Sequence, residues 1–177
     1  MPAPGIKNNS NLPWKEERSV FNLEIKKRIK AVSDNDTIVF EFLAKQTCAS
    51  ICTVDERGFP YCFSCFYAFD INNVLLYFKS SPDSRHSQLL LKNSLVAGTV
   101  LPNKLNKIRV KGIQFEGRAL TDLSSDARHL YYRKFPFAKM VAGDIWAIQL
   151  DKIKLTDSSL VFGKKMNWKR IMENKSI

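Results

Sequence analysis

The stretch "CASICTVDERGFPYCFSCFYAFDINNVLLYFKS", residues 48–80, predicts three β-strands in succession. Three runs rich in small, β-branched and aromatic residues (48–55, 61–69 and 74–80) are separated by the turn-forming segments "ERGFP" and "DINN". Links this short join antiparallel neighbours, because a parallel pair needs a crossover of a dozen or more residues. The fold therefore begins with an antiparallel meander.

The next stretch, "FKSSPDSRHSQLLLKN" (78–93), predicts a short helix directly after the third strand. Ser81 is expected as its cap and Pro82 at its first helical position. Two interpretations of the polar residues stay open. In one, they simply face water. In the other, the helix start seats a phosphate, because free amide donors and the positive end of the helix dipole meet there.

Three more strands are predicted in the second half of the chain. Residues 95–102 and 145–158 have the composition and alternation of strands. Residues 107–123 are long for a single strand, and Gly112 and Gly117 indicate bulges or bends within it. Curved strands of this kind close small barrels. The predicted fold class is mainly β, a six-stranded antiparallel split β-barrel with peripheral helices.

Further helices are predicted outside the strands. Residues 20–32 and 38–46 carry apolar groups at helical spacing. A third helix is expected over 124–135, capped by Ser124 or Ser125.

The composition and charge of the chain limit its function. The 177 residues carry a formal net charge of +11, with a pI near 9.6. A basic surface attracts polyanions nonspecifically, but no zinc-finger, helix-turn-helix or ribonucleoprotein signature accompanies it, so nucleic-acid binding is not expected. The chain lacks an apolar run of roughly 20 residues and a secretory signal. We expect a soluble cytoplasmic protein without membrane association.

The four cysteines, Cys48, Cys52, Cys62 and Cys65, have the spacing C-x3-C and then C-x2-C. Such pairs can form a zinc site. Here both pairs lie in strand-like runs, where positions three apart point to opposite faces, so Cys62 and Cys65 should diverge. We therefore expect reduced core thiols and no metal.

Eight segments of the chain stand out together: "LAKQ" (43–46), "CFYAFD" (65–70), "SRH" (84–86), "AGTV" (97–100), "IQFEG" (113–117), "YYRKFPFAKM" (131–140), "IWAIQLDKIKLTD" (145–157) and "FGKKMNWKR" (162–170). In this order they resemble the YhbP-like family, small bacterial members of the pyridoxamine 5′-phosphate oxidase-like flavin-binding split-barrel superfamily. The resemblance covers roughly residues 36–170, which we take as the split-barrel domain. Residues 1–35 then form an N-terminal extension, partly helical or flexible, and 171–177 a C-terminal tail.

The resemblance implies a homodimer with flavin mononucleotide (FMN) in the groove between two barrels. It places Ser84, Arg85 and His86 at the flavin phosphate, where pyridoxamine-phosphate oxidases have a Ser-Arg-Lys run. The preceding strand end would line the cofactor, and so would several residues farther along the chain. These further candidates are Lys79, Ser80, Ser81, Ser64, Tyr67, Lys111, Gln114, Phe162, Lys164, Trp168 and Arg170.

Three classes of function are compatible with this sequence. The first is an FMN-dependent oxidoreductase of unknown substrate, in which the cofactor supplies the electron chemistry. No arrangement typical of hydrolysis stands out, and no residue is assigned as catalytic. The second class is a non-enzymatic carrier or sensor of flavin, haem or another planar ligand, because fold alone does not separate carrier from catalyst. The third is an anion- or nucleic-acid-binding protein that uses its basic surface.

Overall fold

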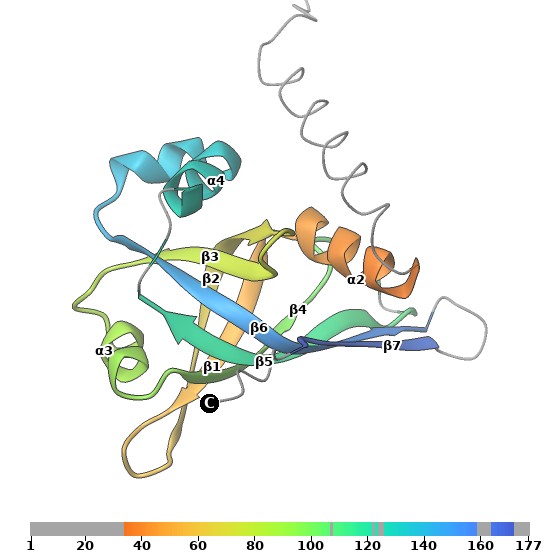
Figure 1. Ribbon diagram of the computed structural model, residues 1–177, viewed down its shortest axis with the longest axis horizontal. Coiled ribbons are helices and arrows are strands. Elements are labelled where there is room, and N and C mark those ends of the chain that lie inside the picture. The colour runs from red at the N-terminus through yellow and green to blue at the C-terminus, as the bar shows by residue number, and fades with distance from the viewer. Residues whose placement is uncertain (1–33, 107, 122, 124–125, 159–163, 172–177) are drawn as a thin grey trace, which may run out of the picture. The chain divides into compact units, whose positions relative to one another are not determined.

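The computed structural model of the protein describes residues 34–106, 108–121, 123, 126–158 and 164–171 (Figure 1). The predicted helix over 20–32 and the predicted caps Ser124 and Ser125 lie outside the described residues. None of the described helices is long and apolar enough to cross a membrane.

Seven antiparallel strands form one sheet in the order β3-β2-β1-β4-β5-β6-β7, and a further pairing of β3 with β6 closes the first six into a barrel (Figure 1). The predicted six-stranded antiparallel barrel is confirmed. The last strand adds to its edge and was not predicted. The strands are β1 (Cys48–Val54), β2 (Pro60–Asp70), β3 (Leu75–Ser80), β4 (Leu95–Val100), β5 (Lys111–Leu120), β6 (Asp144–Asp157) and β7 (Lys164–Lys169).

The long strand β6 is shared between the barrel and the added strand. Its first part pairs with β3 over 144–149 and its second part pairs with β7 over 152–157. Strand β5 runs along both parts, with a register shift between Glu116 and Gly117. The bulge predicted at Gly117 is therefore confirmed. The irregularity predicted at Gly112 is wrong, because Gly112 pairs in regular register with Thr156.

Within the part of the chain that the structure describes, three α-helices and one 3-10 helix accompany the barrel: α2 (Asp34–Lys45), α3 (Arg85–Lys92), α4 (Asp126–Lys134) and η1 (Pro136–Met140). Helix α3 begins later than predicted, since its N-cap is Ser84, whose hydroxyl accepts a hydrogen bond from the Ser87 amide. The assignment of Ser81 and Pro82 to the helix start is wrong. These residues form a turn closed by the Ser84 amide, which donates to the Ser81 carbonyl at 3.1 Å.

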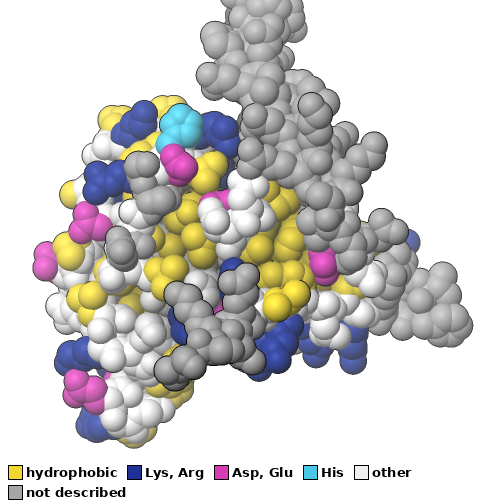
Figure 2. Space-filling view, viewed as in Figure 1, with side chains coloured by type: hydrophobic (Ala, Val, Ile, Leu, Met, Phe, Trp, Pro, Cys, Tyr) yellow, Lys and Arg dark blue, Asp and Glu magenta, His cyan; other side chains and the backbone are white. Residues whose placement is uncertain are grey.

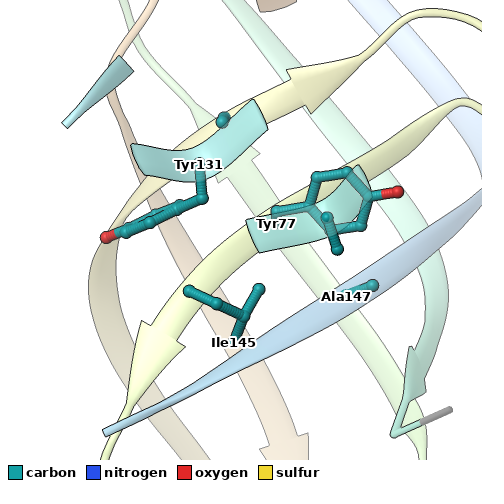
Figure 3. Packing of buried hydrophobic residues seen from close by; sticks show 6 residues of the cluster. Tyr77, Tyr131, Ile145 and Ala147 are labelled. Atoms are coloured by element: carbon teal, nitrogen blue, oxygen red, sulfur yellow. The ribbon is translucent and has the colours of Figure 1, made fainter. Parts of the chain in front are cut away.

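Strand β3 is buried on both of its faces. Leu76 and Phe78 are fully buried on one face, and Tyr77 on the other contributes to a cluster beneath α4. Figure 3 shows Tyr131 of α4 packed with Tyr77 and with Ile145 of β6. The continuous apolar run of β3 reflects this double burial.

Lys134, the last residue of α4, joins that helix to the end of α2. Its ammonium group donates to the carbonyls of Gln46 at 2.6 Å and Ala44 at 3.4 Å, and it lies 5.0 Å from the centre of the Tyr67 ring. Burial lowers the pKa of Lys134 from 10.5 to about 8, because a low-dielectric surrounding disfavours the charged form.

We expect Lys134 to make stability depend on pH. Because its folded pKa of about 8 lies below the ordinary 10.5, the unfolded chain binds more protons between these values, and the unfolding free energy rises with pH there. Lys134→Met keeps the apolar stem and removes the titration. Urea unfolding measures the unfolding free energy of both proteins. The value for wild type minus the value for Lys134→Met should increase as the pH rises from about 8 to 10.5. A flat or falling difference would contradict the burial of the ammonium group.

Candidate functional site

Strand register aligns exposed and partly exposed side chains into two rows across the outer face of the sheet. Each row crosses six strands, from β2 through β1, β4, β5 and β6 to β7, because residues paired in an antiparallel sheet project to the same face. The first row is Ser64, Ser50, Thr99, Gln114, Lys154 and Asn167, and the second row is Cys62, Cys52, Ala97, Glu116, Lys152 and Lys169.

Most of these side chains line an open groove of about 820 Å³, within the range of roughly 300–1,000 Å³ that small-molecule sites occupy. On the barrel side of the sheet beneath it, Gly98 leaves room for the Phe115 ring, because a Cβ atom there would lie 2.4 Å from that ring and 2.5 Å from the Ser50 carbonyl oxygen. Three lysines stand at one end, Lys152, Lys154 and Lys169. The groove therefore has cations at one end, where Lys152 also forms an ion pair with Glu116.

A second polar group, which we call the serine cluster, consists of Ser80, Ser84, His86 and Ser87 at the start of α3. The Ser80 hydroxyl lies 2.6 Å from His86 Nε2, 3.0 Å from the Ser84 hydroxyl and 3.1 Å from the Ser87 hydroxyl. The His86 ring stacks on Phe63 at 4.0 Å between ring centres. The cluster thus joins the end of β3, the first turn of α3 and strand β2.

The serine cluster presents mainly neutral donors, with one cation beside it. Burial lowers the pKa of His86 below 6.5, so its imidazole is neutral at pH 7. Arg85 is exposed, and its guanidinium lies 5.2 Å from the centre of the Tyr61 ring. The first-turn amides of a helix have no intrahelical partners and point outward. The site can therefore accept an anion through hydroxyls, amides and a single arginine.

Two of the candidates from the sequence, Lys79 and Tyr67, have structural partners elsewhere. The Lys79 ammonium donates to the Tyr132 hydroxyl at 3.1 Å and to the carbonyls of Ala138 and Val141. It therefore fastens the segment around η1. Tyr67 is fully buried and its hydroxyl donates to the Leu43 carbonyl at 2.7 Å. The structure does not bring either side chain to the groove or to the serine cluster.

Lys111 and Arg170 also stabilise the barrel. Lys111 forms an ion pair with the buried Asp157 across β5 and β6. Arg170 donates to the carbonyls of Leu150, Asn73 and Val74 at 2.9, 2.9 and 3.0 Å. Val74 has a positive φ of 52°, which is uncommon for a β-branched residue. Arg170 therefore holds a strained turn in place.

The remaining candidates fall into three groups. Ser64 and Gln114 lie in the same row on the groove face, and Ser81 is exposed beside the serine cluster. Trp168 borders the groove, but its ring packs edge-on against Phe40 of α2, 5.7 Å away, on the side of β7 opposite to the row residue Asn167. Phe162 lies outside the described residues, and Lys164 begins β7 without a described side chain.

Sequence reasoning missed Ser87, Phe63 and most members of the two rows. Alternation along each strand would have placed Ser50 with Cys52 and Thr99 with Ala97 on one face. Which residues of neighbouring strands lie opposite one another depends on the strand register, and local sequence patterns do not specify it.

The cysteines are arranged differently from the prediction of core thiols. Cys48 and Cys62 are exposed, while Cys52 and Cys65 are partly exposed. Cys62 lies opposite Cys52 on the groove face, and Cys65 lies opposite the buried Ala49. The predicted divergence of Cys62 and Cys65 is confirmed. Among the described residues, no three His, Cys, Asp or Glu side chains are grouped so that they could hold a metal ion.

The closed six-stranded antiparallel barrel with an added strand defines the chain as a split-barrel protein. A heme-binding protein from Mycobacterium smegmatis shares the fold with a TM-score of 0.61 and 12% identity, over 72% of this chain and 55% of that one. A FAD-binding protein from Mesorhizobium loti does so with a TM-score of 0.54 and 16% identity, over 69% of this chain and 92% of that one.

The chain belongs to the UPF0306 family, which includes YhbP, so the predicted family is confirmed. It is 42% identical to a UPF0306 protein of Citrobacter koseri over 137 residues, which cover 76% of this chain and 93% of that protein. It is 41% identical to the UPF0306 protein YhbP of Salmonella paratyphi B over 140 residues, covering 77% and 95% of the two chains. A comparison with protein-family profiles finds no match.

The different roles of two arginines can be tested by stability measurements. Arg170→Ala should lower the unfolding free energy by about 1.5–3 kcal/mol, because it removes charge-assisted hydrogen bonds to three carbonyls. Arg85→Ala should change it by less than about 0.5 kcal/mol, as expected for an exposed side chain. Urea unfolding of both variants provides the comparison. Equal losses would show that Arg170 has no special structural role.

Proposed function

We propose that this chain is a flavin-binding protein that holds FMN, and that the bound flavin makes it an oxidoreductase. The observation that carries the proposal is the serine cluster with Arg85 at the start of a helix. Phosphate fits this arrangement because helix-start amides, hydroxyl donors and a guanidinium are all suited to its oxygens. The phosphate would replace the hydrogen bonds that Ser80 and Ser84 now make with each other.

Flavin binding also requires a surface for the planar ring, and we propose that the groove provides it. Tyr61 and Phe63, which contact Arg85 and His86, are chain neighbours of Cys62 and Ser64, which end the two rows. Because successive residues of a strand project to opposite faces, the helix start and the groove face lie on opposite sides of β2. Residues 60–66 of β2 pair with β1 but not with β3, so a ligand that uses both sites would pass over this free edge. Gln114 is exposed on that face, where its amide can hydrogen-bond to polar atoms of a ring.

Proteins of this fold bind planar ligands of two kinds, haem and FAD, according to the descriptions of the two proteins compared above. The histidines of this chain favour flavin over haem. There are two of them, and neither lines the groove. His86 Nε2 is bonded to Ser80, and His129 lies exposed on α4. A haem here would lack the histidine ligand that globins and peroxidases use.

Bound flavin supplies hydride and electron transfer. The residues of the chain would bind and orient the cofactor: Arg85, Ser80 and Ser84 at the phosphate, with His86 held neutral beside them. The substrate remains unassigned. Repeated reduction of the bound flavin by NADH or NADPH is expected of an oxidoreductase, whereas a carrier would hold an inert flavin.

We do not assign nucleic-acid binding to the basic surface. On the face shown in Figure 2, Lys and Arg side chains lie at several places and some lie beside Asp or Glu, and at the lysine-lined end of the groove Lys152 forms an ion pair with Glu116. A nucleic-acid surface gathers its positive charge in a patch or stripe.

We also propose that the chain forms a homodimer through the sheet face that carries the two rows. Val54 and Leu95 project from one end of this face with 36% and 62% of their surfaces exposed, and Phe66 projects from the other end with 61% exposed, where its ring lies 5.6 Å from Phe135. Their neighbours are small or uncharged over β1, β2 and β4. Exposed apolar side chains gathered on one face mark interaction sites, and a second copy of the same face would cover them.

The phosphate assignment predicts the effect of removing one side chain. Arg85→Ala should weaken FMN binding by roughly 10- to 100-fold, since a hydrogen bond to a charged group contributes about 1.5–3 kcal/mol. Quenching of FMN fluorescence on titration with protein measures the affinity. The matched control is Arg57→Ala, because Arg57 is also exposed above an aromatic ring, Phe59, at 5.4 Å. Unchanged affinity in a folded Arg85→Ala variant would refute the assignment.

The dimer predicts a second effect. Thr99→Arg places a charge in the middle of the first row and should convert a dimer into a monomer, because a buried unpaired charge is strongly unfavourable. Light scattering at micromolar concentration measures the mass. Gln88→Arg adds the same charge on the exposed side of α3 and should leave the dimer intact. A wild-type protein that is only monomeric would contradict the proposal.

A further inference from the structure

Two thiols face each other across the outer side of the sheet. Cys52 of β1 is paired in register with Cys62 of β2. Backbone hydrogen bonds from the Asp55 amide to the Phe59 carbonyl, and from the Tyr67 amide to the Thr47 carbonyl, are both 2.9 Å long. In an antiparallel pair, hydrogen-bonded and non-hydrogen-bonded positions alternate, so these bonds place Cys52 and Cys62 at a non-hydrogen-bonded position.

This position suits a disulfide. Residues at non-hydrogen-bonded positions have Cα atoms about 4.5 Å apart, with their side chains close together. Disulfides span Cα separations of roughly 4.4–6.8 Å. The two sulfurs can therefore be joined without moving the strands.

The two thiols already interact. A hydrogen bond to Cys62, together with burial and the nearby charge of Cys62, raises the pKa of Cys52 above 9.0. Cys52 therefore stays protonated near neutral pH. Cys62 is the more exposed of the two. The pair thus consists of an accessible sulfur and a second thiol in contact with it.

The other cysteines lack this arrangement. Cys48 is exposed, but the residue opposite it is Phe66. Cys65 lies opposite Ala49, and burial raises its pKa to about 12. Cys65 therefore has no thiol opposite it, and its own thiol stays protonated near neutral pH.

We propose that Cys52 and Cys62 are a reversible oxidation site, which a low-molecular-weight disulfide such as glutathione disulfide converts into a cross-strand disulfide. The Cys62 thiolate attacks one sulfur of glutathione disulfide, which forms a mixed disulfide and releases one glutathione thiolate. Cys52 then loses its proton to solvent and attacks the Cys62 sulfur, which expels the second glutathione. Two protein thiols are oxidised and one disulfide is reduced to two thiols.

The oxidation site is independent of the flavin proposal, but it shares the groove face. Both cysteines line the groove in the second row. Exposed disulfides are generally the labile ones, so a reductant such as dithiothreitol should restore both thiols. Because a second copy of the chain would cover this face, the experiment includes Thr99→Arg. If the two thiols fail to react in wild type but react in Thr99→Arg, a second copy of the chain covers them in wild type. If they fail to react in both proteins, the thiols themselves are unreactive.

The test uses the reduced full-length chain, incubated with glutathione disulfide without flavin, then denatured and alkylated for intact mass spectrometry. Two double variants isolate the pair: Cys48→Ser with Cys65→Ala keeps Cys52 and Cys62, and Cys52→Ser with Cys62→Ser removes them. Wild type and the first variant should each lose two alkylatable thiols and two hydrogen atoms of mass. The second variant should form no internal disulfide.

Three results would overturn the proposal. The first is a stable glutathione adduct in place of an internal disulfide, both in wild type and in Thr99→Arg. The second is full alkylation of all cysteines in both proteins. The third is the absence of an internal disulfide from the first double variant, which keeps only Cys52 and Cys62. In tryptic digests, cleavage after Arg57 separates Cys52 from Cys62, so a linked pair of peptides from the first double variant would identify the bond directly.

Discussion

The bulge beside Gly117 is the constraint on which the rest of this structure depends. A Cβ atom at Gly117 would lie 2.2 Å from the Gln149 carbonyl oxygen, so no other residue fits without moving backbone. At this point Glu116 pairs with Lys152 and Gly117 pairs with Leu150, which leaves Asp151 as the extra residue of β6. Arg118 binds the Asp151 carboxylate through two hydrogen bonds of 3.0 and 3.1 Å. The bulge redirects β6 from β3 to β7 and so closes the barrel.

The same register creates the candidate site. Because each strand keeps its alignment across the sheet, side chains from six strands form two continuous rows on the outer face. A shift of one residue in any strand would send its members of both rows to the opposite face. The serine cluster depends on a different junction, where β3 ends at Ser80 and Ser84 caps α3. The site is thus assembled by strand register and one helix cap.

Much of the fold followed from local sequence, because strands with alternating or wholly apolar runs and short turns are specified over a few residues. Strand β7 was missed because "KKMNWK" is mostly polar and becomes a strand only by pairing with β6. The cap of α3 was misplaced because Ser81 and Ser84 are both good caps, and the choice depends on which hydroxyl reaches the first-turn amide. Lys79 and Arg170 resembled ligand residues, but their partners are backbone carbonyls distant in sequence.

The central claim is that a UPF0306 chain with this groove and serine cluster retains FMN. The most direct test is the absorbance spectrum of the purified protein after excess FMN has been added and free ligand removed by desalting. Retained bands near roughly 375 and 450 nm, as expected of a bound flavin, are the predicted result. A spectrum without these bands would contradict the claim, and a Soret band in the protein as purified would identify haem as the ligand in its place.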